Sequence, residues 1–324
     1  MVERAGSRAH RALRARRARL IDSRPRKPAS VLIHLNGRLV DERDAHISVL
    51  DRGFLFGDGV YELVRYFDGR GVALEAHAAR LARSLAHARI AGFDAARLGA
   101  IAAELLDVNG LRDATVYLQV TRGAGAVRSH VPTTTLVPTV VAFAAAAEPL
   151  ASLVAPAEVA AITAEDTRWR RCEIKTVSLM GNILHLLAAD DAGAAEAILH
   201  RGGLVGEGGY SNVAIASRGV LVTPPLDEDP PILHGTARAD LLDAAREAGV
   251  PVAVRPVALE ELRAADEVLI TSSRRFVNAV VRLDGATVGG GAAGPLCRRL
   301  FEAIRDRIAR GVHAGAAPCT PTGP

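Results

Sequence analysis

The chain has 324 residues, of which 49% are hydrophobic and 23% charged, so it is globular and long enough for two domains, not disordered or fibrous. Its longest apolar stretch, residues 135–147, is shorter than the roughly 20 residues of a membrane-spanning helix and ends in alanines. Cys172, Cys297 and Cys319 lie too far apart for a disulfide framework or a zinc knuckle, which predicts a protein of the reducing cytoplasm.

The positive charge of the chain is concentrated at its N-terminus. The net charge is +4, but residues 1–30 contain nine Arg and one Lys against two acidic residues, so the rest of the chain carries −4. This tail lacks the apolar core of a secretory signal. A transit peptide and a phosphate-binding arm are two alternatives, and we interpret the tail as a disordered extension. Because the body is mildly acidic, we do not expect nucleic-acid binding. Removal of residues 1–30 without loss of activity would exclude a function based on the tail.

The predicted small N-terminal domain covers residues 31–147 and begins with a hairpin. Residues 31–41 read as two strands around Asn36-Gly37, a dipeptide that accepts the positive φ angles of a two-residue turn. A Gly-rich stretch follows at 51–70. Apolar spacing then predicts helices over 75–90 and 94–110, strands over 114–123 and 134–145, and a loop at 125–133 between those strands.

The predicted C-terminal domain, residues 157–312, follows a linker at 148–156. The sequence pattern predicts a helix at about 178–191, strands with glycine turns over 195–225, a helix over 235–249, strands over 267–273 and 280–285, and a terminal helix near 296–310. Residues 313–324 are interpreted as a second disordered tail. Strands and helices mixed in two halves indicate an α+β protein of two domains.

Lysine is almost absent from this sequence. Among 40 Lys and Arg residues only Lys27 and Lys175 are lysines, and Lys27 lies in the tail. Arginine cannot be deprotonated near neutral pH, so it cannot act as an amine nucleophile. Lys175 is therefore a candidate for amine chemistry, as a Schiff-base lysine or a proton-transferring base. Drift in an Arg-rich chain is the plain alternative.

A pyridoxal-phosphate site around Lys175 would need a carboxylate for the pyridine nitrogen and a cup for the phosphate. Glu207 lies between glycines that let the backbone approach a flat ligand, although a surface turn explains it equally well. Gly235 and Thr236 start a predicted helix whose free amides suit a phosphate. The other candidates for the phosphate are Arg80, Ser272 and Ser273.

A third requirement is a group that recognises the substrate carboxylate. Arg128 and His130, in the loop sequence VRSH, supply a guanidinium fork and an imidazole ring for this purpose. Two solvated loop residues are the alternative. His185, His200 and His234 lack the short paired spacing of a metal site such as HExxH, so we expect no metal.

In order along the chain, these segments resemble the class IV pyridoxal-phosphate aminotransferases, and within them the D-amino-acid aminotransferases. The resemblance spans about residues 31–285 and is carried by DRGFLFGDGVYE, HAARL, VYLQVTRG, VRSH, RWRRCEIKTVSLMGN, EAILHRGGLVGEGGYSNV, ILHGTAR and EVLITSS. It implies the two-domain fold type IV architecture, with a small N-terminal α/β domain and a larger domain around a β-barrel-like core.

The resemblance also implies a role for each candidate residue. Lys175 is the Schiff-base lysine and proton shuttle, and Glu207 is the partner of the pyridine nitrogen. The phosphate is held by Arg80, by the amides of Thr236 and Ala237 and by Ser273, while Tyr61 faces cofactor and substrate. In the D-amino-acid enzymes the residues matching Tyr117, Arg128 and His130 reach in from the neighbouring subunit as a carboxylate trap. A homodimer follows from that arrangement.

Three features depart from the family pattern. The segment GTAR places its hydroxyl one position before that of the usual GITR, and the VRSH loop is one residue longer. Ser273 is followed by Arg274 and Arg275, where relatives carry small or polar residues. Guanidiniums at that place are candidates for binding a second carboxylate, as in D-glutamate or D-aspartate, or they point away from the substrate.

The sequence therefore predicts a pyridoxal-phosphate-dependent transaminase that moves an amino group between a D-amino acid and a 2-oxo acid. Two alternatives remain open. A branched-chain L-aminotransferase would share everything except the trap at Arg128 and His130, and an aminodeoxychorismate lyase runs an elimination on the same scaffold. Stereochemical preference depends on which side of the cofactor the trap occupies, so the sequence alone does not fix it.

Overall fold

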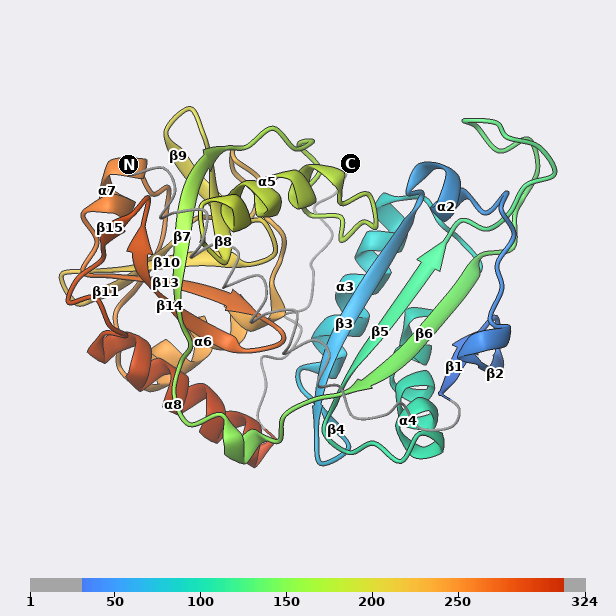
Figure 1. Cartoon of the computed structure of the whole chain (residues 1–324), viewed down its shortest axis with the longest axis horizontal. Helices are drawn as coiled ribbons and strands as arrows, with labels where there is room; N and C mark the ends of the chain where they lie inside the picture. The colour runs from blue at the N-terminus through green and yellow to red at the C-terminus, as the bar shows by residue number, and fades with distance from the viewer. Residues whose placement is uncertain (1–30, 312–324) are drawn as a thin grey trace, which may run out of the picture.

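The structure, a computed structural model, describes residues 31–311, so the predicted tails at 1–30 and 313–324 lie outside the described residues. Two strand assemblies organise this part of the chain, one in each half, and the linker around 148–156 joins them (Figure 1). This is the α+β architecture that the sequence predicts.

The N-terminal half is built on a six-stranded antiparallel sheet in the order β2-β1-β6-β5-β3-β4. The predicted hairpin is confirmed, because Asn36 and Gly37 both have positive φ angles, 51° and 84°, between its two strands. The strand bounds are β1 Leu32–Leu35, β2 Arg38–Asp41, β3 Gly59–Phe67, β4 Arg70–Gly71, β5 Ala114–Thr121 and β6 Thr139–Ala146.

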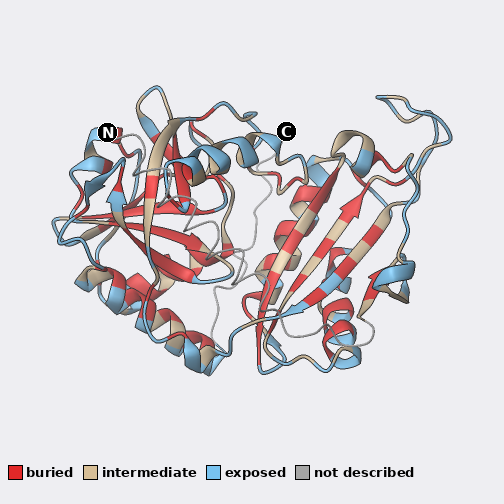
Figure 2. Cartoon of the chain, viewed as in Figure 1, coloured by how far each residue is buried: buried red, intermediate tan, exposed pale blue. Residues whose placement is uncertain are grey.

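Helices α3 (Leu74–His87) and α4 (Leu98–Val108) cover one face of this sheet. Leu81, Leu98 and Leu105 of these helices are fully buried in a core shared with β3, β5 and β6. Figure 2 shows buried segments on both the helices and the strands of this half. The short helices of this half and the linker are η1 Glu42–Asp44, α2 Arg52–Phe56, η2 Ala95–Arg97 and η3 Leu150–Ser152. Apolar residues at helical spacing thus produced the helices where they were predicted.

The C-terminal half is built around a closed ring of strands in the order β10-β13-β14-β7-β8-β9, with β9 returning to β10. That closing contact pairs Glu207 with Asn212. The strand bounds are β7 Glu158–Glu165, β8 Glu196–Arg201, β9 Leu204–Gly208, β10 Asn212–Ser217, β11 Val220–Thr223, β12 Val252–Val254, β13 Glu267–Ser272, β14 Phe276–Leu283 and β15 Ala286–Thr287. The barrel-like core predicted from the resemblance is confirmed.

Buried aliphatic side chains such as Ile198, Ile215 and Ile270 form one core of this half. A second core lies beneath the barrel, where α6 (Thr236–Glu247) and α8 (Pro295–Arg310) pack on each other and on β13 and β14. Helix α5 (Met180–Asp191) lies against β7 and β8, and α7 is the short helix Leu259–Arg263. Within residues 31–311, no helix is both long enough and apolar enough to cross a bilayer.

Three details differ from the prediction. The strand predicted over 134–145 begins only at Thr139, because Pro138 offers no N–H to a sheet ladder. Strand β3 lies in the stretch that was read only as Gly-rich. Strand β7 was not predicted at all, because its alanine-rich sequence EVAAITAE carries a weak alternation signal and gains its stability from parallel pairing with β8 and β14.

Candidate active site

A single pocket of about 170 Å³ lies between the two halves and brings together most of the predicted site residues. The residues of the predicted site that line it are Tyr61, Arg80, Lys175, Glu207, Gly235, Thr236, Ala237, Ser272 and Ser273. They come from β3, α3, the segment before α5, β9, the start of α6 and the end of β13. Residues up to 212 positions apart in the chain thus meet at one place, since Tyr61 and Ser273 both line it.

The segment that carries Lys175 is fixed to the N-terminal sheet. The Tyr61 N–H donates to the Lys175 carbonyl oxygen at 3.0 Å, and the Val177 N–H donates to Gly59 at the same distance. The Lys175 N–H donates to the Ser84 hydroxyl of α3 at 3.2 Å, and Ile174 packs into the core of the N-terminal half. The stretch thus runs antiparallel alongside the start of β3, with a bridge between Val60 and Thr176.

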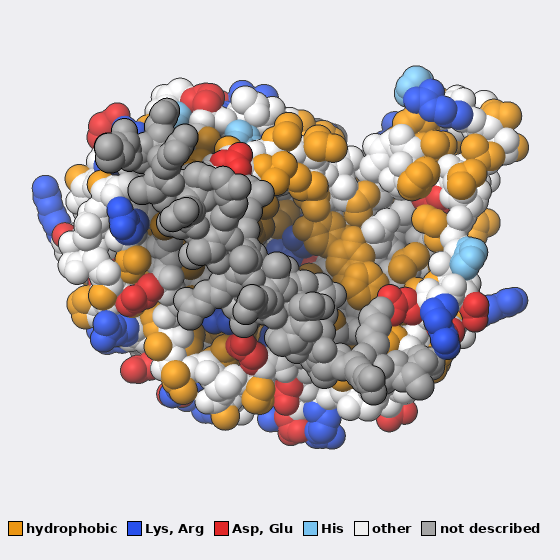
Figure 3. All heavy atoms as spheres, viewed as in Figure 1, with side chains coloured by type: hydrophobic (Ala, Val, Ile, Leu, Met, Phe, Trp, Pro, Cys, Tyr) orange, Lys and Arg blue, Asp and Glu red, His pale blue; other side chains and the backbone are white. Residues whose placement is uncertain are grey.

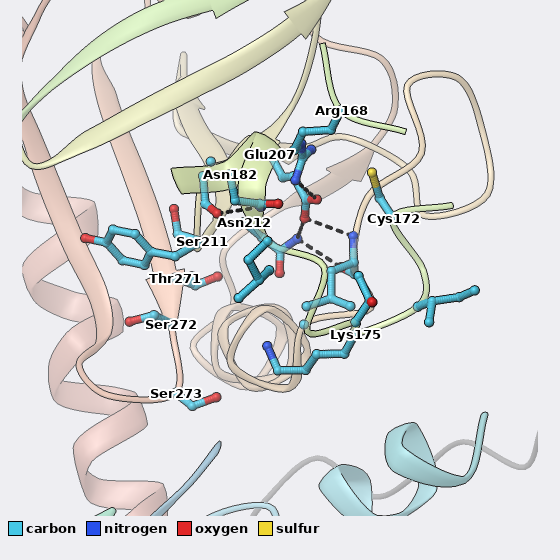
Figure 4. A pocket seen from close by; sticks show the side chains of 18 of the residues that line it. Arg168, Cys172, Lys175, Asn182, Glu207, Ser211, Asn212, Thr271, Ser272 and Ser273 are labelled. Carbon is cyan, nitrogen blue, oxygen red and sulfur yellow. Dashed lines mark hydrogen bonds and ion pairs between the residues drawn. The ribbon is translucent and has the colours of Figure 1, made fainter. Parts of the chain in front are cut away.

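The Lys175 side chain extends from this segment across the pocket, towards the side that carries Ser272 and Ser273 (Figure 4). Its Nζ lies 4.3 Å from the centre of the Tyr61 ring. No carboxylate among residues 31–311 forms an ion pair with this amine. The amine is therefore held by its backbone and by the tyrosine face, and it remains available to a ligand.

Glu207 is the buried carboxylate of the pocket, with 5% of its surface exposed. It accepts hydrogen bonds from Arg168 at 3.0 Å, from the Leu233 N–H at 2.9 Å and from the Asn212 amide at 3.2 Å. Burial raises the pKa of Glu207, and the Arg168 charge and the Leu233 N–H act against that rise. The ion pair and the two further donors favour an ionised carboxylate, the form that keeps a ring nitrogen protonated.

Helix α6 directs its N-terminus into the pocket. It begins at Thr236 after the N-cap Gly235, and no side chain caps it. The first N–H groups of the helix, including those of Thr236 and Ala237, therefore have no acceptor within the helix and form the positive end of its dipole. A Cβ on Gly235 would collide with the Asn212 amide, so glycine is required for this close approach. The arrangement suits an anionic phosphate.

Arg80 belongs to a buried network between the two halves. Its guanidinium binds both oxygens of Glu62, at 2.7 and 2.8 Å, and donates to the His234 carbonyl oxygen at 3.0 Å. Burial acts to raise the pKa of Glu62, but Arg80 and His77 outweigh it and hold that pKa well below its usual range. Arg80 is thus a fixed cation at the edge of the pocket.

His77 connects this network to α6. Burial lowers the pKa of His77, which favours the neutral ring. Its Nδ1 lies 2.6 Å from Glu62 and its Nε2 lies 3.2 Å from the Thr236 hydroxyl. The tautomer that satisfies both contacts donates from Nδ1 to the carboxylate and accepts the hydroxyl proton at Nε2. The shifted hydroxyl of GTAR therefore joins α6 to α3.

Tyr117, Arg128 and His130 do not line the pocket of their own chain. Tyr117 stacks between Tyr61 and Phe143, with ring centroids 5.4 and 5.0 Å away, on the sheet face opposite α3 and α4. Arg128 lies 4.9 Å over the Phe56 ring, and the Arg52 guanidinium donates to the backbone of the loop at Ser129 and His130. The loop is therefore ordered against α2, away from Lys175.

Arg274 and Arg275 occupy the exposed turn between β13 and β14, directly after the two pocket serines. Arg275 lies 3.5 Å from Glu148 of the linker. Arg274 forms no ion pair with any residue in the range 31–311, and its charge acts on Tyr210, which lines the pocket. Of the two guanidiniums, only Arg275 thus has an ion-pair partner within residues 31–311, and Arg274 directly follows a serine that lines the pocket.

Several functional positions were missed in the sequence. Arg168, Asn212 and Asn182 line the pocket and bind Glu207 or the turn that follows it, yet no role was assigned to them. The arginine-rich stretch RWRR at 168–171, a few residues before Lys175, is a usable signal for Arg168. Glu62 and His77 carry a weaker signal, namely a carboxylate on a mainly apolar strand and a histidine three residues before Arg80 on a helix.

The donor set of this pocket fits pyridoxal 5'-phosphate. A buried carboxylate, an amine without an ion-pair partner among the described residues and an open helix N-terminus face one cavity, as a ring nitrogen, an aldehyde and a phosphate require. The part of the chain that the structure describes contains no cluster of three or more His, Cys, Asp and Glu side chains placed to bind a metal.

A family model described as amino-transferase class IV matches residues 59–283. The chain belongs to the class IV aminotransferases, and it is an aminotransferase. It is 41% identical over 276 residues to the D-alanine aminotransferase of Bacillus licheniformis, an alignment that covers 84% of this chain and 95% of that protein. With the D-alanine aminotransferase of Staphylococcus haemolyticus it shares 35% identity over 278 residues, 85% of this chain and 97% of the other.

Among solved structures, the chain is similar to a branched-chain aminotransferase from Thermoproteus uzoniensis with norvaline. The TM-score is 0.77 and the identity 27%, over 87% of this chain and 96% of that one. A branched-chain amino acid aminotransferase from another source, complexed with N-(5'-phosphopyridoxyl)-L-glutamate, gives a TM-score of 0.78 and an identity of 25%, over 88% and 96% of the two chains. A fold IV transaminase from Curtobacterium pusillum gives a TM-score of 0.73 and an identity of 26%, over 85% and 92%. These similarities confirm the predicted fold.

Proposed function

We propose that this protein is a pyridoxal-phosphate-dependent transaminase that moves an amino group between a D-amino acid and a 2-oxo acid. The observation that carries the proposal is one pocket in which Lys175, Glu207 and the start of α6 face one another. Relatives at 35–41% identity named D-alanine aminotransferases support the choice of substrate class.

When bound, pyridoxal 5'-phosphate supplies an aldehyde that condenses with amines and a ring that accepts the electron pair released at the substrate Cα. In the proposed site, the Lys175 Nζ would hold the cofactor through its aldehyde, and it is the group placed to move the substrate Cα proton. Glu207, fixed by Arg168, keeps the ring nitrogen protonated. The α6 amides, with Arg80, Ser272 and Ser273 around them, bind the phosphate.

We further propose that the protein is a homodimer. Helix α5 exposes an apolar stripe at positions 180, 183, 184 and 187, where Met180 is 68% and Leu184 is 59% exposed in the single chain. Hydrophobic side chains gather beside the notch between the two halves (Figure 3). A second copy that covers the stripe would bring Tyr117, Arg128 and His130 of its uncovered sheet face and loop towards this pocket.

Complementation tests this arrangement. Lys175→Ala and Arg128→Ala proteins, each with little activity, are dissociated, mixed and allowed to reassociate. A shared site predicts partial recovery, because a mixed dimer contains one site with an intact lysine and an intact trap. Reassociated dimers that remain as inactive as the parents would contradict the proposal that the trap comes from the neighbouring subunit.

A branched-chain L-amino-acid aminotransferase is the second candidate, because solved enzymes with that name share the fold at TM-scores near 0.77. The half-reaction separates the two candidates. The cofactor-loaded protein is mixed with D- or L-alanine, glutamate or leucine, and the absorbance change of the bound cofactor is followed. Rapid reaction with D-alanine and D-glutamate is expected, whereas reaction confined to L-leucine would overturn the proposal. A cytoplasmic location remains a prediction from the cysteine content.

A further inference from the structure

Glu196 is a buried carboxylate that the proposed chemistry does not use. It is the first residue of β8, and no part of its surface is exposed. No cation among residues 31–311 forms an ion pair with it. Burial of a carboxylate without a cation costs stability unless hydrogen bonds satisfy its oxygens. The donors around Glu196 therefore indicate its role.

The donors around Glu196 come from the turn Gly208–Ser211, which joins β9 to β10. One carboxylate oxygen accepts from the Gly209 N–H at 2.9 Å, and the other accepts from the Ser211 hydroxyl at 2.6 Å. The Tyr210 N–H is a further donor from the turn, and the Ala197 N–H completes the set at 2.8 Å. The carboxylate thus lies within the concave side of the turn.

The glycines of this turn are explained by the same contact. Neither Gly208 nor Gly209 has a positive φ angle, so backbone conformation does not require them. A Cβ on Gly208 would lie 2.6 Å from a Glu196 oxygen, and one on Gly209 would lie 3.1 Å from the other oxygen and 2.9 Å from Leu186. The sequence EGGYS therefore lets the turn close onto the carboxylate, and larger residues would push the two apart.

The opposite side of the turn faces the cofactor pocket. Gly208, Gly209, Tyr210 and Ser211 all line that pocket, and the Asn182 amide of α5 donates to the Gly209 carbonyl oxygen at 2.8 Å from that side (Figure 4). The two ends of the turn are Glu207 and Asn212, the pair through which the barrel closes. A displacement of the turn would therefore move both groups that surround the proposed ring nitrogen site.

We propose that Glu196 is a positioning residue of the cofactor site, which holds the turn Gly208–Ser211, and through it Glu207 and Asn212, in the geometry that faces the pocket. The identity of the cofactor in this inference rests on the proposed function. The contacts between Glu196 and the turn do not depend on it. Burial raises the pKa of Glu196 to about 7, although the hydrogen bonds that reach it act in the opposite direction.

Hydrogen–deuterium exchange of the cofactor-free protein tests the turn directly. In Glu196→Ala the Tyr210 amide loses its acceptor and the Gly209 amide keeps only the Ala197 carbonyl oxygen, so we expect at least tenfold faster exchange in a peptide covering 208–212. Glu196→Gln retains one acceptor oxygen and the shape of the side chain, and an intermediate rate is expected. Ser211→Ala removes a donor without leaving a buried N–H unpaired, and should exchange within about twofold of the parent.

A matched control is Glu267→Ala. Glu267 also binds backbone amides with both oxygens, those of Leu296 and Cys297 at 2.8 Å each, but it does so at the start of α8 and outside the pocket. This variant should lose thermal stability without faster exchange at 208–212. If both variants accelerate exchange there equally, or if neither Glu196→Ala nor Glu196→Gln does so, the turn is not held by Glu196 and the proposal is wrong.

The second measurement is the affinity for pyridoxal 5'-phosphate itself, followed by its absorbance on titration into the cofactor-free variants. Glu196→Ala should bind at least about tenfold more weakly than the parent, with Glu196→Gln between them and Glu267→Ala unchanged. Unchanged binding in Glu196→Ala would overturn the positioning role. A parent protein that binds no pyridoxal 5'-phosphate would instead contradict the proposed function, and the exchange experiment would still decide the claim about the turn.

Discussion

The two walls of the pocket are built in different ways. On the N-terminal side, strand-like hydrogen bonds to Gly59 and Tyr61 of β3 and the α3 hydroxyl of Ser84 fix the Lys175 backbone. On the C-terminal side, the pocket is formed by turns and a helix start, and buried side chains such as Glu196 and Asn212 hold them. The Lys175 segment is thus held by backbone contacts to one strand, whereas Glu207 and the start of α6 are held by side-chain contacts that join separate elements.

This difference orders the expected effects of substitution. Lys175→Arg removes the only amine of the N-terminal wall while keeping its charge, so we expect transamination to fall by at least ~10⁴-fold, the upper part of what a positioned proton-transferring group supplies. Steady-state rates with D-alanine measure the loss. Lys27→Arg, which changes the other lysine of the chain, is the matched control and should leave the rate unchanged. A Lys175→Arg enzyme with measurable parent-like turnover would remove the lysine from the account.

Glu207→Gln tests the opposite wall. Its hydrogen bonds can be largely retained, but the negative charge beside Arg168 is lost, so the ring nitrogen is less readily protonated. The half-reaction is expected to slow by ~10²- to 10³-fold while cofactor binding persists. Single-turnover absorbance measures both quantities. The exposed Glu165, changed to Gln, is the control. Parent-like rates in Glu207→Gln would place the essential carboxylate elsewhere.

Arg128→Ala tests whether Arg128 binds the α-carboxylate of the substrate. Loss of a charge-assisted contact to the substrate α-carboxylate should lower kcat/KM by roughly 30- to 1000-fold for D-alanine and D-glutamate alike. Measurement of kcat/KM for both substrates checks this. Unchanged values for both would remove the trap, and with it the main sequence argument for D-amino acids over branched-chain L-amino acids.

Glu196→Gln gives a smaller, pH-dependent effect on stability. The pKa of Glu196 is raised from 4.5 to about 7, so between these pH values the folded protein keeps a proton that the unfolded chain has released. Stability contributed by that proton is present below pH 4.5 and is lost as the pH rises to 7. A glutamine does not titrate, so its stability relative to the parent should increase by up to about 3 kcal/mol from pH 4.5 to 8.

Denaturant unfolding of the cofactor-free proteins at pH 5 and pH 8 measures this difference, with Glu165→Gln as an exposed control. If Glu196→Gln is more stable at pH 8 but binds the cofactor more weakly, Glu196 positions the turn at a cost in the stability of the fold. A stability difference that is the same at both pH values would contradict the assignment of the titration to Glu196.

Arg274→Ala has the smallest expected effect and concerns only the pocket mouth. Because Arg274 has no ion-pair partner within residues 31–311, its guanidinium can receive a second carboxylate. The loss should be about tenfold in kcat/KM for D-glutamate and D-aspartate, as for one charge-assisted hydrogen bond, and absent for D-alanine. Arg275→Ala, whose side chain already faces Glu148, is the matched control. Equal losses for D-alanine and D-glutamate would exclude a side-chain-specific role.

The sequence predicts the reactive residues of this site better than the residues that position them. Lys175 is identifiable because arginine had replaced nearly every other lysine, and Glu207 because glycines flank it. Glu196 and His77 are not identifiable from the sequence. Their roles depend on tertiary contacts, of Glu196 with the turn at Ser211 and of His77 with the start of α6 at Thr236. The same limit applies to β7, whose parallel partners are distant in sequence.

The proposed function requires that Lys175 and the turns opposite it form one cofactor site. Borohydride reduction of the protein loaded with pyridoxal 5'-phosphate, followed by proteolysis and mass spectrometry, tests it directly. We expect a single phosphopyridoxyl group on Lys175, and no label on the corresponding peptide of Lys175→Arg. A label on Lys27, or a parent protein that takes up no label, would contradict it.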